Sequence, residues 1–196
     1  MFKKAFVPAL KAFVFFSVLC GIVFTLVVTG IAQIVFPYQA NGSIITANDG
    51  TQYSELIGQS YTDPAHLWGR WNSYSMVELD NGETQAWGAG SNASPATEQY
   101  ADTIAERVAY IQEANPDAKG AVPNDLVTQS GSGLDPEISA AAAEYQVPRV
   151  AQASGKSEDE VRSIIEKCTN HKFLGIFGED TVNVLKVNLM LDGKLS

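Results

Sequence analysis

The residues that come closest to a chemical site are the serine–glycine run at positions 130–133. The run lies between a predicted strand, residues 122–128, and a helix predicted to begin at Asp135-Pro136. Backbone N–H groups at the start of a helix favour anions, so this order of elements resembles a phosphate cradle. A dinucleotide motif would need a third glycine where Pro136 stands, and Asp135 adds a negative charge. We interpret the run as a turn and helix cap. The alternative is that it binds an anion, which would make the chain a membrane-anchored extracellular solute- or anion-binding module.

Other motifs for nucleotide binding or catalysis are missing from the sequence. There is no GxxxxGK[ST] phosphate loop, and Ser130 stands where a GxSxG nucleophile elbow requires glycine. His66 and His171 are the only histidines; neither has a second type of metal ligand at ligand spacing or a nucleophile to activate. We therefore expect two surface histidines, no metal site and no catalytic site. An anchored hydrolase is a third and weaker hypothesis.

The rest of the chain is positioned by an apolar stretch over residues 12–36. No charged residue occurs between Lys11 and Asp49. At about 1.5 Å per residue, a helix of this length spans ~37 Å, enough to cross a hydrocarbon core of ~30 Å. The stretch is apolar all round, whereas a helix of a soluble core needs only one apolar stripe. We predict one N-terminal transmembrane helix.

The orientation of this helix follows from its flanking charges. Three lysines (Lys3, Lys4 and Lys11) precede it, and the next basic residue is Arg70. Because basic residues favour the cytoplasmic side, residues 1–11 are predicted to be cytoplasmic. Residues 37–196 are then predicted to lie outside, making the chain a single-pass protein of the cell membrane.

Two other interpretations of the apolar stretch compete with an uncleaved anchor. A cleaved signal peptide has an apolar region of ~7–15 residues, shorter than this one, and residues 29–32 make a poor cleavage site. A lipoprotein would use Cys20 as the lipidated residue, but the bulky Leu19 precedes it where a small residue is needed. We therefore favour the anchor.

Small residues recur along the predicted helix at intervals of four. They are Ser17, Gly21, Thr25 and Thr29. Small side chains at this spacing let a second helix approach closely, which is how helices pack in lipid. Because Gly and Thr are also common in membrane helices, a stripe of chance composition is the alternative. We predict that this face packs against a partner helix.

Charge is distributed unevenly along the chain. All 22 acidic residues but only ten of the 13 basic ones follow the apolar stretch, which gives that part a formal charge of −12. Such a charge argues against nucleic acid or anionic lipid as a partner. Cys20 lies in the predicted anchor and Cys168 beyond it, so we expect neither a disulfide between them nor a cysteine metal site.

The pattern after the anchor predicts an α+β domain. A turn at Asn48-Asp49-Gly50 joins two short strands, and residues 58–92 are predicted to be an irregular, aromatic-rich loop that contacts a partner. Predicted helices begin at Ser94-Pro95, at Asp135-Pro136 (with a break at Pro148) and at Ser157, whose spacing to Glu160 indicates a capping box. Alternating apolar residues predict a last strand over Thr181 to Leu191.

Several blocks of the sequence are similar to a known family. The longest is VPNDLVTQSGSGLDPEIS at residues 122–139, followed by QVPRVA at 146–151 and VNVLKVNL at 182–189. Shorter matches are YQANGS at 38–43, IGQ at 57–59, GR at 69–70 and GSN at 90–92. In these blocks the chain resembles the C subunit of the Kdp potassium-transporting ATPase. The resemblance extends from the anchor nearly to the last residue, but departs at 60–90, where Trp71 replaces the family's usual proline.

This resemblance implies a non-catalytic accessory subunit of a high-affinity, ATP-driven potassium uptake complex. The expected partners are a channel-like potassium-binding subunit, a P-type ATPase subunit and a small hydrophobic subunit, which this chain would assemble and stabilise. The complex would use ATP, Mg²⁺ and K⁺, whereas this chain alone would bind no cofactor. The family is also described as raising the affinity of the ATPase subunit for ATP.

The resemblance further implies that Gln146 and Arg149 help to bind nucleotide. The predicted topology opposes this role, because both residues would lie outside the membrane and ATP binds in the cytoplasm. The alternative is structural: Arg149 pairs with an acidic residue, and Gln146 hydrogen-bonds backbone near the break expected at Pro148.

Overall fold

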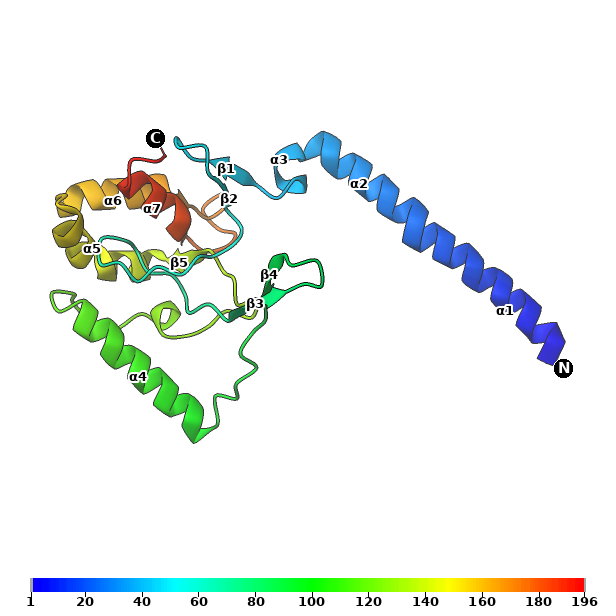
Figure 1. The fold of residues 1–196 in the computed structure, drawn as a ribbon, viewed down its shortest axis with the longest axis horizontal. Coiled ribbons are helices and arrows are strands. Elements are labelled where there is room, and N and C mark those ends of the chain that lie inside the picture. Colours follow the sequence, from blue (N-terminus) through cyan, green and yellow to red (C-terminus); the bar gives the residue numbers. More distant parts are fainter. Residues whose placement is uncertain (1, 196) are drawn as a thin grey trace. The chain divides into compact units, whose positions relative to one another are not determined.

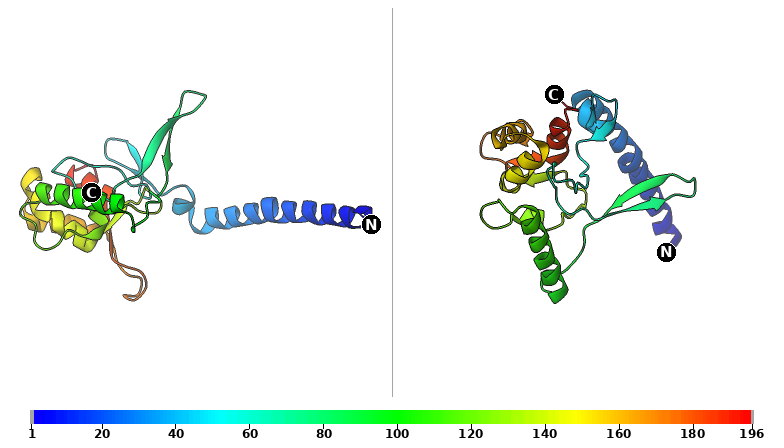
Figure 2. Two further views of the ribbon diagram at one scale, coloured as in Figure 1. Left: turned by 90° about the horizontal axis from the view of Figure 1, so that it is seen from below. Right: turned by 60° about the vertical axis from the view of Figure 1, so that its left-hand side comes forward.

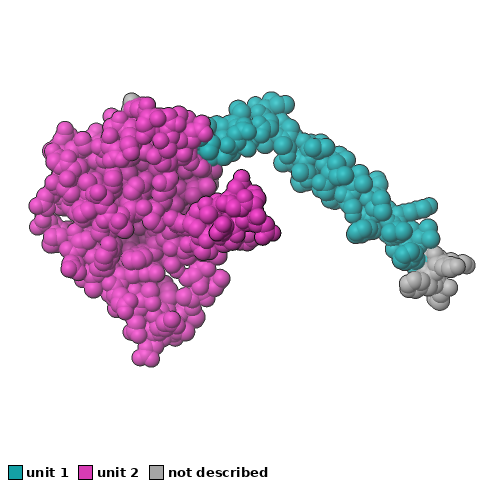
Figure 3. Space-filling view, viewed as in Figure 1, with its two compact units in different colours: residues 1–44 teal, residues 45–196 magenta. Residues whose placement is uncertain are grey.

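The computed structural model describes residues 2–195 and divides into two compact units, residues 1–44 and 45–196 (Figure 3). Unit 1 is essentially one helical rod. It consists of α1 (Phe2–Phe16), a π-helical segment (Ser17–Val23) and α2 (Phe24–Val35), followed by the single turn α3 (Pro37–Ala40). From Ala5 to Val35 the rod has an 18-residue window with a mean hydropathy of 2.6, none of it buried within the chain. Its length and composition would allow it to cross a membrane, as the sequence predicts.

Unit 2 is built on a small antiparallel sheet in the order β5-β7-β6. Figure 1 labels its first strand, β5. The strands are β5 (Glu137–Ser139), β6 (Thr169–Asn170) and β7 (Thr181–Asn183), with Val182 of β7 opposite Ile138 on one side and Thr169 on the other. Helices α5 (Ala140–Ser154), α6 (Glu158–Lys167) and α7 (Val184–Leu191) share one apolar core with this sheet. Val147, Val150, Val161, Val182 and Val187 are completely buried in it. The α+β class expected for the domain is confirmed.

Local sequence signals place several of these helices. Ser157 and Glu160 form the predicted capping box, in which each side chain bonds the backbone N–H of the other residue. The helix expected near Ser94 is α4 (Glu98–Ala114), but its N-cap is Thr97, whose side chain accepts a hydrogen bond from the backbone of Tyr100. It ends before Asn115, as predicted.

The aromatic-rich region 58–92 is less irregular than expected. It contains the hairpin β3 (Tyr74–Glu78) and β4 (Thr84–Gly88), which pair from Tyr74↔Gly88 to Glu78↔Thr84. Figure 2 shows this green hairpin extending from the rest of unit 2. The hairpin expected around Asn48-Asp49-Gly50 is also present, as β1 (Ile44–Thr46) paired with β2 (Gln52–Ser54).

One predicted strand is wrong, and another is too long. Residues 122–128 contain a short 3₁₀ turn, Asn124–Leu126. The last strand, predicted over 181–191, ends at Asn183, where α7 begins. Asn183 caps α7 by accepting a hydrogen bond from the backbone N–H of Lys186 (3.0 Å). Because α7 is buried over most of its surface, its sequence is apolar enough to satisfy the two-residue period of a strand as well.

The helix expected from Asp135-Pro136 with a break at Pro148 also differs. Strand β5 intervenes, and α5 begins at Ala140 with Ser139 as its cap. The helix then continues through Pro148 to Ser154. A proline removes one backbone hydrogen bond, but the residues on both sides of it, Val147 and Arg149, are buried, and their packing outweighs this local cost.

Gly58 packs closely against the backbone that follows the serine–glycine run, and substitutions can test this contact. A Cβ on Gly58 would lie 2.3 Å from the carbonyl oxygen of Asp135, whereas a Cβ on Gly131 would have no atom within 4 Å. We expect Gly58→Ala to lower the free energy of unfolding by about 1–3 kcal/mol, because backbone must move. Gly131→Ala, the matched control, should stay within ~0.5 kcal/mol of the parent. Urea denaturation of both variants measures this, and equal stability would contradict the close approach.

Candidate functional site

Gln146 lies on the inner face of α5 and is only 1% exposed. Its amide nitrogen donates to the carbonyl oxygens of Trp68 (3.0 Å) and Ala142 (3.1 Å). Its amide oxygen accepts from the backbone N–H of Trp68 (2.8 Å). The predicted bonding of Gln146 to backbone is therefore confirmed, and the backbone that it binds includes a residue 78 positions away.

Arg149, one turn further along α5, is buried and held by neutral oxygens. Its guanidinium donates to the carbonyls of Pro64 (2.6 Å) and His66 (3.0 Å) and to the side-chain oxygens of Asn115 (2.9 Å) and Gln146 (2.7 Å). These bonds use all three guanidinium nitrogens. The predicted pairing of Arg149 with an acidic residue is wrong: among the residues described, no carboxylate lies within ion-pair distance of it.

The burial of Arg149 has an electrostatic cost. Removal from water lowers the pKa of its guanidinium to about 10, which leaves the group charged at neutral pH. The guanidinium also lies over the ring of Trp68, 4.2 Å from the ring centroid, where the electron-rich face stabilises a cation. Carbonyl dipoles and an aromatic face thus replace the carboxylate that the sequence led us to expect.

A third polar side chain, Asn188 of α7, completes the network and was not singled out in the sequence. It accepts from the backbone N–H of Leu67 (2.8 Å) and donates to the carbonyl of the same residue (2.9 Å). The signal available was an asparagine inside the otherwise apolar run from Val187 to Leu191. We name the segment fastened by these side chains, residues 63–69, the tethered segment.

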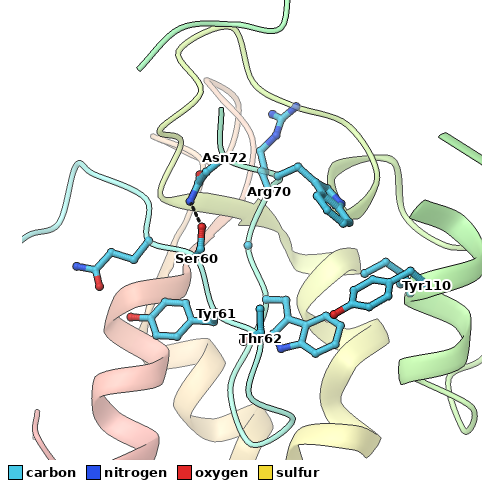
Figure 4. Close-up of a pocket in the computed structure, with 11 residues that line it drawn as sticks. Ser60, Tyr61, Thr62, Arg70, Asn72 and Tyr110 are labelled. Carbon is cyan, nitrogen blue, oxygen red and sulfur yellow. Dashed lines mark hydrogen bonds between the residues drawn. The ribbon is translucent and has the colours of Figure 1, made fainter. Parts of the chain in front are cut away.

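An aromatic cleft opens next to the tethered segment (Figure 4). It has a volume of about 190 Å³, and its walls include Trp68, Trp71, Tyr110 and Arg70. The rings of Trp68 and Tyr110 stack with centroids 5.4 Å apart. Arg70 is held at the cleft wall by Asp135 (3.3 Å) and by the carbonyl oxygen of Gln129 (3.0 Å). Gln146 and Arg149 do not line the cleft.

The cleft has the composition of a contact surface. A hydrogen bond between Asn72 and Ser60 (3.1 Å) forms part of its polar rim, which Figure 4 shows above the aromatic floor. Its lining contains no histidine, cysteine or carboxylate. Over residues 2–195, no cluster of three or more metal-ligating side chains is found. A flat aromatic side chain or an apolar segment of a partner fits this lining best.

The serine–glycine run forms a closed turn. The hydroxyls of Ser130 and Ser132 bond each other (3.0 Å) and accept from the backbone N–H groups of Gly133 (3.0 Å) and Leu134 (3.1 Å). The run leads into β5, so the helix start that an anion cradle requires is missing at this place. These two N–H donors are occupied within the chain.

The two histidines differ in environment. His171 is exposed, as predicted, and lies 3.2 Å from Glu166 and 3.7 Å from Asp180. His66 is less exposed than predicted. Its side chain is 19% exposed, and its Nε2 lies 2.8 Å from a carboxylate oxygen of Asp192. This contact joins the tethered segment to the end of α7.

The small residues Ser17, Gly21, Thr25 and Thr29 are exposed along the rod of unit 1. In an α-helix, four residues overshoot a full turn by about 40° because 3.6 residues make one turn. In the wider π-helical turn of Ser17–Val23, with its i→i+5 bonds, four residues fall short of a full turn. The two deviations oppose each other, so the stripe stays straighter than in an uninterrupted α-helix.

The fold and the site define an α+β domain, preceded by one helix long enough to cross a membrane, whose buried polar side chains fasten its own backbone. The model of the KdpC family, described as the c chain of the K⁺-transporting ATPase, matches residues 6–193. This chain therefore belongs to the KdpC family. Potassium transport and membership of an ATPase complex follow from the family, and the single apolar helix fits a single-pass membrane protein.

Relatives along nearly the whole length support this assignment. A potassium-transporting ATPase KdpC subunit of Clostridium botulinum (strain Alaska E43) is 48% identical over 197 residues, covering 99% of this chain and 98% of the relative. The KdpC subunit of Clostridium perfringens is 49% identical over 191 residues, covering 95% and 96%. That of Geobacter sulfurreducens is 43% identical, covering 96% and 97%.

The geometry of Gln146 predicts a structural effect of its loss. Gln146→Leu keeps a similar volume but leaves the N–H and carbonyl of Trp68 without their bonds. We expect the free energy of unfolding to fall by about 2–4 kcal/mol, because buried unpaired polar groups are costly. Gln152→Leu, on the exposed side of the same helix, is the control. Urea unfolding followed by Trp fluorescence gives both values, and a neutral Gln146→Leu would mean that its hydrogen bonds contribute no stability.

Proposed function

We propose that this chain is a non-catalytic accessory subunit of a high-affinity, ATP-driven potassium uptake complex. Its role is to assemble and stabilise a channel-like potassium-binding subunit and a P-type ATPase subunit, together with a small hydrophobic subunit. The observation that carries the proposal is the family match over residues 6–193, with relatives named as subunits of a potassium-transporting ATPase. The aromatic cleft supports it, because its lining suits contact with a partner better than chemistry.

The rod of unit 1 would be the first assembly surface. Its large apolar side chains, from Phe13 to Val35, are exposed and therefore need lipid or other helices. The straightened stripe of small residues offers the close approach that helix packing in lipid requires. A cytoplasmic N-terminus and a domain outside the membrane follow from the three lysines before the helix.

An effect on ATP affinity would pass through the partner subunits. Gln146 and Arg149, the residues that the family resemblance connects with nucleotide, are buried and bonded to their own chain. A nucleotide could reach them only if the tethered segment came away. We therefore place the use of ATP, Mg²⁺ and K⁺ in the other subunits, and propose that this chain raises ATP affinity by stabilising their arrangement.

The packing of the stripe can be tested at Gly21. A Cβ at this position meets no atom of the chain within 4 Å, so Gly21→Leu leaves the isolated subunit unstrained. We expect it to weaken association with the other subunits roughly tenfold, in line with helix contacts of about 1–2 kcal/mol. Co-purification of the complex from membranes measures this.

The matched control is Val23→Phe, which adds bulk on the opposite side of the rod. Its yield of intact complex should equal that of the parent. Normal assembly of Gly21→Leu would remove the stripe as a packing face. Equal loss in both variants would point to a general intolerance of bulk.

Topology can be tested with a single reactive cysteine at Lys119, which is exposed. Cys20 is replaced by alanine, and Cys168 can remain because burial raises the pKa of its thiol to about 11 and keeps it unreactive at neutral pH. We expect Lys119→Cys in intact cells to react with a membrane-impermeant maleimide. Labelling only after permeabilisation would reverse the orientation and remove the topological argument against nucleotide contact, but not the argument from burial.

A further inference from the structure

The connection between β6 and β7 carries four large apolar side chains that the fold does not bury. Phe173, Leu174, Ile176 and Phe177 are 70%, 73%, 77% and 63% exposed. The left view of Figure 2 shows this orange segment extending away from the helices of unit 2. A contiguous group of this kind is unusual on the surface of a soluble protein and marks contact with a membrane or another molecule. We call residues 173–177 the apolar loop.

The apolar loop is a closed turn. Phe173 and Phe177 exchange backbone hydrogen bonds in both directions (2.8 and 3.0 Å), which fixes its ends. Leu174 has a φ of +55°, in the left-handed region that favours glycine and asparagine. Its side chain is mostly exposed, so packing within the chain does not repay this conformation. An exposed leucine in this disfavoured conformation suits a contact outside the chain.

The base of the apolar loop carries more acidic than basic side chains. Lys172 pairs with Glu179 (3.1 Å), and His171 lies between Glu166 (3.2 Å) and Asp180 (3.7 Å). There is thus no excess of basic side chains here to attract anionic headgroups. The loop therefore suits contact with an apolar medium, and its charges do not attract anionic lipid.

The anchor keeps a bilayer within reach of the loop. Only residues 36–44 separate the end of α2 from unit 2, and fully extended they would span at most about 30 Å. A domain of the size of residues 45–196 has a radius of gyration of about 15 Å, so a loop on its surface can meet the membrane. Because the anchor holds the domain at the bilayer, the effective concentration of lipid around the loop is high. A small apolar surface on the loop is then enough for it to bind the bilayer.

We propose that the apolar loop inserts Phe173, Leu174, Ile176 and Phe177 into the interfacial region of the bilayer that the anchor spans. The contact is with the upper acyl chains, and it gives the domain a second attachment to the membrane besides the helix. This limits the angles that the domain can adopt. The proposal rests on the anchor and on the loop geometry, and it holds for either orientation and without any partner subunit.

The test uses the full chain in nanodiscs of phosphatidylcholine, without other subunits. Ile176→Cys in a Cys20→Ala background carries an environment-sensitive fluorophore, and Lys119→Cys in the same background is the control. We expect blue-shifted emission at position 176 and about twofold quenching by lipids brominated on the upper acyl chain, with neither effect at 119. Added phosphatidylglycerol should not strengthen the quenching, because the base of the loop has no excess of basic side chains and the domain is acidic.

Two results would overturn the proposal. Emission typical of water at position 176, without quenching, would show a loop that stays in solvent. Blue-shifted emission that brominated lipid does not quench would show burial against protein, such as a second copy of the chain.

A second variant separates lipid contact from a role in folding. Leu174→Asn, added to the labelled Ile176→Cys protein, suits the left-handed backbone and should keep or raise the melting temperature of the domain. We expect quenching at position 176 to fall about twofold, because one inserted side chain is lost. Unchanged quenching with normal stability would contradict the assignment of Leu174 to the bilayer.

Discussion

The fold of the domain depends on how one segment without secondary structure is buried. Residues 63–69 have no strand partner, yet Leu67 is completely buried. Buried backbone groups must find hydrogen bonds, and here side chains of two helices supply them. Gln146 and Asn188 each bond both the N–H and the carbonyl of one residue, as a neighbouring strand would. This contact joins α5, α7 and the wall of the aromatic cleft into one body.

The sequence predicts those features of the fold that depend on local signals. The apolar helix, the capping box at Ser157 and the turn at Asn48-Asp49-Gly50 are each specified by neighbouring residues, and all are present. The sequence does not distinguish a strand from a helix that is largely buried, as at residues 184–191. An apolar run there fits both the two-residue period of a strand and the 3.6-residue period of a helix. The hairpin β3–β4 lies in a region whose glycines and aromatic residues suggested only a loop.

The site was less predictable than the fold, for a physical reason. Charge composition suggested an acidic partner for Arg149, because the domain has a large excess of carboxylates. The actual partners are main-chain carbonyls of residues more than 80 positions away, brought together only by folding. Asn188 shows the same limit, since its role depends on which backbone happens to lie beside α7. Family resemblance connected Gln146 and Arg149 with nucleotide, whereas the geometry shows both residues bonded to their own chain.

The oxygens that hold Arg149 have a consequence for how the domain tolerates acid. Acid denaturation usually proceeds by protonating carboxylates that are paired in the native state. Amide and carbonyl oxygens do not take up protons in that range, so the anchoring of the guanidinium stays intact as the medium becomes acidic. A domain with many carboxylates, all of which become neutral in acid, thus keeps a central fastening that contains none.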